Sequence, residues 1–143
     1  MEEYIFICIG TNKLIADSFG PRVGEKLQKR LEHFSKVRVL GTMRKPIHFK
    51  NAEETLKQLP PYYQQQMILI DSAIGKDEEI GNTYYNLGGI KMGKAFGKEL
   101  YFPAHFNIKT IIGNQNYIPN WTTFQIDKLA EKVANQVSYN FLF

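Results

Sequence analysis

Two short segments of this chain are apolar at every position. They are residues 4–9 (YIFICI), which precede Gly10, and residues 67–70 (MILI), which precede Asp71. A strand with one face in water alternates polar and apolar side chains, whereas a strand covered on both faces reads as an unbroken apolar run. The two runs therefore predict central strands of a mostly parallel sheet.

Helical patterns separate and follow these runs. One helix is expected from about Pro21, a residue that suits the first helical position, and it carries an apolar stripe at spacings of three or four. A short helix is expected with Asn51 as its N-cap, and a last helix begins at a capping box of Thr122 and Gln125. Further strands are expected at residues 37–40, 83–85 and 106–112. This alternation predicts a three-layer α/β/α fold.

Length and composition predict one domain, residues 1–143. The hydrophobic fraction of 43% and the charged fraction of 22% are those of a globular chain, and no repeat or linker interrupts the sequence. Cys8 is the only cysteine and no basic, apolar leader precedes it, so we expect a cytoplasmic protein without a membrane span. The net charge of +4 is scattered rather than clustered, so we expect no direct nucleic-acid binding.

Asp17 and Asp71 are the strongest candidates for chemistry. Asp17 lies between the first strand and the first helix, and Asp71 follows the second apolar run. Parallel strands bring such positions to one edge of the sheet, where α/β proteins bind ligands. Two neighbouring carboxyl groups can share a proton and activate water, or hold a divalent metal. Alternatively, Asp17 only caps the helix and Asp71 only ties down its own loop.

Other titratable side chains are weaker candidates. His48 and His105 could each be a metal ligand or a proton carrier. A lone histidine is more often a packed or surface residue, and we favour that interpretation for both. A metal site would draw on Asp17, Asp71 and His105, because three ligands are the minimum expected. Cys8 lies among isoleucines and phenylalanine, which favours core packing over a nucleophilic role.

A glycine-rich segment, residues 88–97, has the spacing of a phosphate-binding loop. Ala95 stands where a hydroxyl residue is needed for Mg²⁺, so the match is attributed to chance. We interpret the segment as a basic loop over the aspartate edge, with Lys91 and Lys94 as substrate-binding residues.

Four blocks of the sequence resemble the sporulation protein family of the YyaC type. They are CIGT with DSFGPRVG (residues 8–11 and 17–24), GT followed by PIH (residues 41–48), IDSAIG (residues 70–75), and a looser block over residues 89–114. That family is similar to the spore germination protease and, more distantly, to hydrogenase maturation peptidases. Met92 departs from the pattern, since proline is expected there, and the chain is much shorter than the germination protease.

The resemblance implies a peptidase/phosphorylase-like fold and aspartate-dependent peptide hydrolysis. It places Asp17 and Asp71 in the blocks that hold the two functional aspartates of the germination protease, an acid endopeptidase of small acid-soluble spore proteins. It also implies the forespore or mother cell of a spore-forming bacterium as the location. Hydrogenase maturation peptidases bind nickel through acidic residues and a histidine, so a divalent metal is an alternative, although no cofactor is expected.

Three hypotheses follow. The first is a sporulation-related, germination-protease-like peptidase that uses Asp17 and Asp71 on a peptide or protein substrate. The second is a non-catalytic regulatory or ligand-binding module that keeps the peptidase fold, and the third is metal-dependent hydrolysis or sensing. The aromatic tail, residues 141–143, further suggests a homo-oligomer, because terminal apolar side chains need a surface to bury against.

Overall fold

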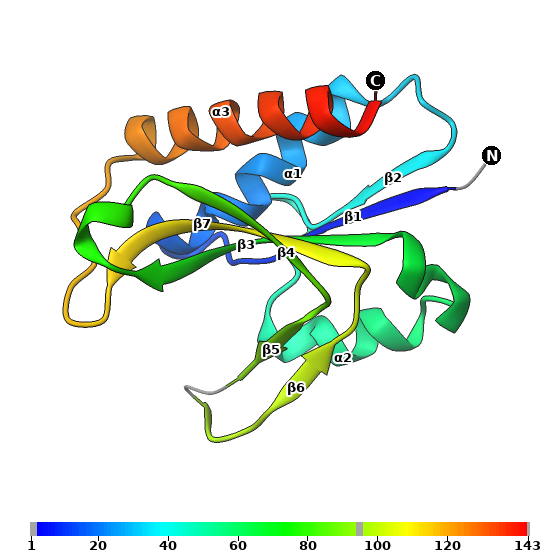
Figure 1. The fold of residues 1–143 in the computed structure, drawn as a ribbon, viewed down its shortest axis with the longest axis horizontal. Helices are drawn as coiled ribbons and strands as arrows, with labels where there is room; N and C mark the ends of the chain where they lie inside the picture. The colour runs from blue at the N-terminus through cyan, green and yellow to red at the C-terminus, as the bar shows by residue number, and fades with distance from the viewer. Residues whose placement is uncertain (1–2, 94–95, 143) are drawn as a thin grey trace.

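The central sheet is mostly parallel, as the apolar runs predict. A computed structural model describes residues 3–93 and 96–142, and within them the main sheet has five strands in the order β2-β1-β3-β7-β4. The strands β1, β2, β3 and β7 run parallel, and β4 closes one edge antiparallel to β7 (Figure 1). Their bounds are Tyr4–Cys8 (β1), Val37–Leu40 (β2), Met67–Gly75 (β3), Thr83–Leu87 (β4) and Phe106–Asn114 (β7).

Helices cover both faces of this sheet, which confirms the three-layer α/β fold. On one face lie α1 (Phe19–Arg30) and α3 (Thr123–Leu142); on the other lie α2 (Phe49–Lys57) and a hairpin of β5 (Ile90–Met92) and β6 (Leu100–Phe102) (Figure 1). Short 3-10 turns occupy Ala16–Ser18 (η1), Pro61–Gln66 (η2) and Asp77–Glu79 (η3). No helix in the described part of the chain is long and apolar enough to cross a membrane.

The apolar runs lack alternation because each supplies two cores. In β1, Phe6 and Cys8 pack with α1 and α3, whereas Ile5 and Ile7 pack on the side of α2. All four side chains are at most 1% exposed. The burial of Cys8 confirms that it packs in the core, and burial also raises the pKa of its thiol, which disfavours the reactive thiolate.

Glycines allow α1 to approach the strands at backbone distance. A Cβ atom on Gly20 would lie 1.9 Å from the carbonyl oxygen of Ile9, and one on Gly24 would lie 1.9 Å from that of Gly41. Gly41 itself has φ near +90°, in the left-handed region that favours glycine. These glycines of the DSFGPRVG and GT blocks therefore fix the position of α1, which begins two residues after Asp17.

Several boundaries differ from the sequence-based expectation. The helix α1 begins at Phe19 rather than Pro21, and α2 begins at Phe49 with His48 as its N-cap, so that Asn51 is a first-turn residue. The strand β3 continues to Gly75 instead of stopping at residue 70. The capping box of the last helix is confirmed, because the amide of residue 125 bonds to the side chain of Thr122 and the reverse bond is also made.

Two other segments also differ from the sequence-based expectation. The segment with phosphate-loop spacing contains β5, so it forms a hairpin rather than a strand, loop and helix. Phe141 of the aromatic tail packs within the chain, with ring centroids 5.7 Å from Phe6 and 5.0 Å from Phe106. Phe141, the first of the three tail residues that motivated a homo-oligomer, is therefore in contact with the sheet, and the homo-oligomer stays a prediction.

Candidate functional site

Asp71 lies where β3 extends beyond its neighbour. Cys8, the last residue of β1, pairs with Ile70, so Asp71 is the first residue of β3 past the end of β1. On the other side Asp71 pairs with Lys109 of β7. Alternation along β3 directs Asp71 to the same face as Met67 and the α2 layer. The end of β1 thus leaves the carboxyl group of Asp71 just past that strand, while β3 and β7 continue beyond it.

The folded protein strongly raises the pKa of the Asp71 carboxyl group. Desolvation by the surrounding chain raises the pKa of Asp71 from 3.8 to about 7. A hydrogen bond from the Ser72 amide, 2.8 Å from Oδ1, and the charge of Lys109 lower it, and the charge of Asp17 raises it further. Asp71 therefore exchanges a proton near neutral pH, and Asp17 is close enough to contribute to that behaviour.

Asp17 is held by its backbone and by the turn that contains it. Its carbonyl oxygen accepts a bond from the Thr11 amide at 2.9 Å, and a Cβ atom on Gly10 would lie 2.3 Å from that same oxygen. The side chain of Asp17 makes no helix cap, because the N-cap position of α1 is Ser18. The carboxylate of Asp17 is thus not consumed by capping.

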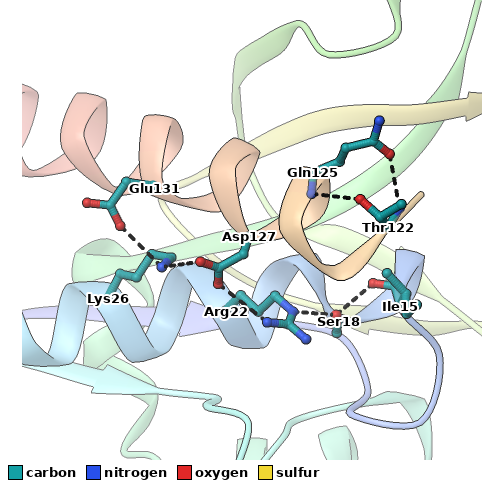
Figure 2. Close-up of polar contacts among 8 residues, drawn as sticks. All are labelled: Ile15, Ser18, Arg22, Lys26, Thr122, Gln125, Asp127 and Glu131. Carbon is teal, nitrogen blue, oxygen red and sulfur yellow. Dashed lines mark hydrogen bonds and ion pairs between the residues drawn. The ribbon is translucent and has the colours of Figure 1, made fainter.

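An ion-pair network between α1 and α3 anchors the turn η1. Arg22 donates to the Ser18 hydroxyl at 2.8 Å, and that hydroxyl donates to the Ile15 carbonyl at 2.6 Å (Figure 2). Asp127 of α3 pairs with Arg22 at 3.4 Å and with Lys26 at 3.0 Å. Figure 2 shows these side chains aligned along the facing sides of the two helices, so α3 helps to position the residue next to Asp17.

A cleft of about 500 Å³ opens beside Asp17. Its lining comes from the loop after β1, from the start of α2 and from the loop of the β5–β6 hairpin: Thr11, Asn12, Lys13, Leu14, Asp17, Pro46, His48, Phe49, Lys50 and Phe96. A larger groove of about 810 Å³ lies between β4 and α3, but none of the candidate site residues predicted from the sequence lines it. The smaller cleft is the better candidate site, because Asp17 lines it and the charge of Asp17 reaches Asp71.

His48 has a defined hydrogen-bonding state in this cleft. Its Nδ1 accepts a bond from the Lys50 amide at 3.2 Å, and its own amide donates to the Asn51 side chain at 2.8 Å. Because Nδ1 is an acceptor, we assign the ring proton to Nε2. Burial and the charges of Lys13 and Lys50 lower the pKa of His48, so the neutral ring that caps α2 is favoured.

The structure separates the other predicted residues from this edge. The amide of His105 bonds to the carbonyl of Met67, so His105 lies beside the start of β3, four residues or about 13 Å along the strand from Asp71. Lys91 is exposed on the hairpin and pairs with Glu99 at 3.8 Å. Lys94 lies outside the described residues.

The residues present do not form an evident metal site. No group of three histidine, cysteine, aspartate or glutamate side chains that could hold an ion occurs within residues 3–93 and 96–142. The predicted set of Asp17, Asp71 and His105 is therefore not assembled, because His105 lies toward the opposite end of the strands. The two carboxyl groups alone do not fit the imidazole-containing donor set that suits nickel.

Sequence reasoning missed three basic residues of the site. No local pattern in the sequence points to Lys109, because its position beside Asp71 depends on the register of β3 and β7. Lys13 and Lys50 are far apart in sequence and meet at the cleft because residues 9 and 47 form a parallel bridge. The one local signal is that Lys13 lies in the loop that follows the first apolar run.

Comparison with known proteins agrees with the fold. The structure is similar to that of the NiFe hydrogenase maturation protease HycI from Thermococcus kodakarensis KOD1, with a TM-score of 0.62 over 96% of this chain and 90% of that one, at 17% sequence identity. The likeness supports an α/β fold of the kind found in that peptidase.

The sequence is also 24% identical over 115 residues to the uncharacterized protein YyaC of Bacillus subtilis (strain 168). The match covers 80% of this chain and 55% of that protein, so the chain spans about half the length of this relative. The family profile described as "Protein of unknown function (DUF1256)" matches residues 1–136, and the chain therefore belongs to the DUF1256 family.

Proposed function

We propose that this protein is an aspartate-dependent peptide hydrolase. The observation that carries the proposal is the carboxyl group of Asp71, whose pKa of about 7 lies at the value that suits proton transfer at neutral pH. It lies just past the carboxyl end of β1 and within the electrostatic reach of Asp17, and Asp17 in turn lines an open cleft. A carboxyl group with a strongly raised pKa and a second carboxyl group within electrostatic reach is a candidate for proton transfer.

The roles of the residues follow from these positions. In its ionised form Asp71 accepts a proton from a water molecule as that water attacks the peptide carbonyl carbon. The protonated Asp71 then donates to the leaving amine as the carbon–nitrogen bond breaks, so the proton account balances. Asp17 orients the water from the cleft side. Lys109 pairs with Asp71 in the strand register, and its positive charge stabilises the ionised form of Asp71.

The biological setting is part of the proposal. The sequence blocks shared with the YyaC type support a role in sporulation or germination, in the forespore or mother cell. Small acid-soluble spore proteins are accordingly the first substrates to test. The basic residues at the cleft, Lys13 and Lys50, suit a substrate with acidic residues.

A cleavage assay tests the proposal. The wild-type chain, Asp17→Asn, Asp71→Asn and the control Glu78→Gln are incubated with an unfolded protein substrate and with acid-soluble spore proteins, and fragments are measured by mass spectrometry. Glu78 is an exposed acidic residue of η3, so its amide variant removes one carboxylate outside the site. We expect cleavage by the wild type and the control, and a loss of about a hundredfold or more in each aspartate variant. Undiminished cleavage by Asp71→Asn would refute the assignment.

A second candidate function is a non-catalytic ligand-binding module with the same fold. The observation that favours it is the cleft itself, whose lysines and aromatic rings can hold a ligand without any participation of Asp71. Absence of cleavage by the wild-type protein, combined with ligand binding that is equal in the wild type and Asp71→Asn, would select this function.

A further inference from the structure

The cleft beside Asp17 has a positive end. Lys13 and Lys50 both line it, and neither ammonium group forms an ion pair with another residue in the described ranges. The two charges converge on His48, because both oppose its protonation. Two converging ammonium groups without a protein counter-ion are suited to an anionic partner.

His48 adds a hydrogen-bond donor at the same place. Its Nδ1 is occupied by the Lys50 amide, so Nε2 carries the proton of the neutral ring. Asp17 lines the same cleft and repels an anion. The anionic group of a ligand is therefore directed toward Lys13 and Lys50 and away from the carboxylate of Asp17.

An aromatic pair supplies an apolar wall. The rings of Phe49, at the start of α2, and Phe96, from the hairpin loop, are stacked with centroids 5.1 Å apart and planes 5° apart. Gly93 allows this approach, because a Cβ atom there would lie 2.1 Å from the Phe49 ring. The cleft that holds the two lysines thus also has an apolar surface, which suits methylene groups.

We propose that this cleft is a subsite for the side chain of a glutamate, or of the shorter aspartate, in an extended peptide. The carboxylate binds Lys13, Lys50 and the Nε2–H group of His48, and the methylene groups pack on Phe49 and Phe96. The adjoining peptide bond is then presented on the side of Asp17. The last statement rests on the proposed hydrolase function, whereas binding of the acidic side chain does not.

Binding of blocked peptides tests the subsite directly. The probes are acetyl-Ala-Ala-Glu-Ala-Ala-amide and its glutamine twin, titrated into the Asp71→Asn protein, in which turnover is suppressed, and followed by NMR. We expect the glutamate peptide to bind about tenfold more tightly than the glutamine peptide, with a preference that falls as salt is added. We also expect the ring resonances of His48 to titrate at higher pH when the glutamate peptide is bound.

Matched lysine variants identify the binding residues. Lys13→Ala with Lys50→Ala removes both charges but keeps the Lys50 amide that donates to the capping Nδ1 of His48, and we expect it to abolish the preference for glutamate. Lys57→Ala with Lys91→Ala removes two exposed lysines that do not line the cleft, and we expect the preference to persist. Equal affinity for the two peptides, no binding of either, or a preference that survives the first pair of substitutions would overturn the proposal.

Two further probes separate other anions from an acidic side chain. Inorganic phosphate that binds at the cleft more tightly than the glutamate peptide would replace the proposal with a phosphate site. An unblocked Ala pentapeptide that binds as tightly as the glutamate peptide would replace it with a site for a terminal carboxylate. The result is independent of the hydrolase proposal, because the binding assay uses Asp71→Asn and the cleavage assay uses the active chain.

Discussion

Replacing Asp71 with asparagine should make the folded protein more stable at alkaline pH. The native carboxyl group is desolvated, and its pKa rises from 3.8 to about 7, so ionising it in the folded state is unfavourable. Each pKa unit corresponds to about 1.4 kcal/mol, so the shift of about three units amounts to about 4 kcal/mol. Asparagine carries no charge, and its Oδ1 can still accept the bond from the Ser72 amide.

The sign of the pH dependence follows from proton binding. Between the unfolded pKa of 3.8 and the folded pKa of about 7, the folded state holds more protons at Asp71 than the unfolded state does. The stability of the wild type therefore falls as pH rises through this window, and the loss is complete above the folded pKa. In Asp71→Asn this loss is absent, whereas every other titrating group is retained.

Urea denaturation of both proteins at about pH 4 and about pH 9 measures this difference. We expect the free energy of unfolding of Asp71→Asn, minus that of the wild type, to increase by about 4 kcal/mol from the lower to the higher pH. Such a change is large beside the total stability of about 5–15 kcal/mol that is usual for a domain. The exposed Glu78→Gln should show no comparable change. A difference that is the same at both pH values would refute the desolvated state of Asp71.

Three other perturbations probe the scaffold and the site. Gly24→Ala forces a Cβ atom to within 1.9 Å of the Gly41 carbonyl oxygen, so we expect a loss of about 3 kcal/mol in urea denaturation; a loss below 1 kcal/mol would contradict this packing. Arg22→Ala removes the bonds to Ser18 and Asp127, so we expect a loss of about 1–2 kcal/mol and altered backbone amide shifts around Asp17, whereas unchanged shifts would show that the network does not position the turn. Incubation with EDTA should leave cleavage and the urea midpoint unchanged, since the described residues gather no three-donor cluster; a chelator-sensitive protein would revive the metal hypothesis.

The layers of the fold could be predicted because they depend on local patterns. Unbroken apolar runs identified β1 and β3, and the reciprocal bonds of Thr122 and Gln125 mark the start of α3 as expected. The helix α2 begins three residues earlier than expected, because histidine is an uncommon N-cap and Asn51, three residues later, has the usual side chain. Local competition between two capping residues is resolved only by the chain that packs around them.

The site could be predicted only in part. Asp71 was assigned to the edge because residue 70 was expected to end its strand, which is wrong for β3. Asp71 reaches the edge for another reason, namely that the neighbouring β1 stops at Cys8. The placement of Lys109 and the meeting of Lys13 with Lys50 depend on strand pairing between distant segments, which no local pattern encodes.

The energetics of the edge distinguish scaffold from function. Gly20 and Gly24 allow α1 to pack closely on the chain below it, because a larger side chain at either position would collide with the backbone of Ile9 or Gly41. Packing alone therefore explains these two glycines. Asp71 is the opposite case, because its charge is unfavourable in the folded state and an amide of nearly the same shape would avoid that cost. A group that lowers stability at neutral and alkaline pH, just past the carboxyl end of β1, is not explained by packing and is consistent with the proton-transfer role proposed for it. The stability measurement on Asp71→Asn and the cleavage assay on the same variant should therefore move in opposite directions.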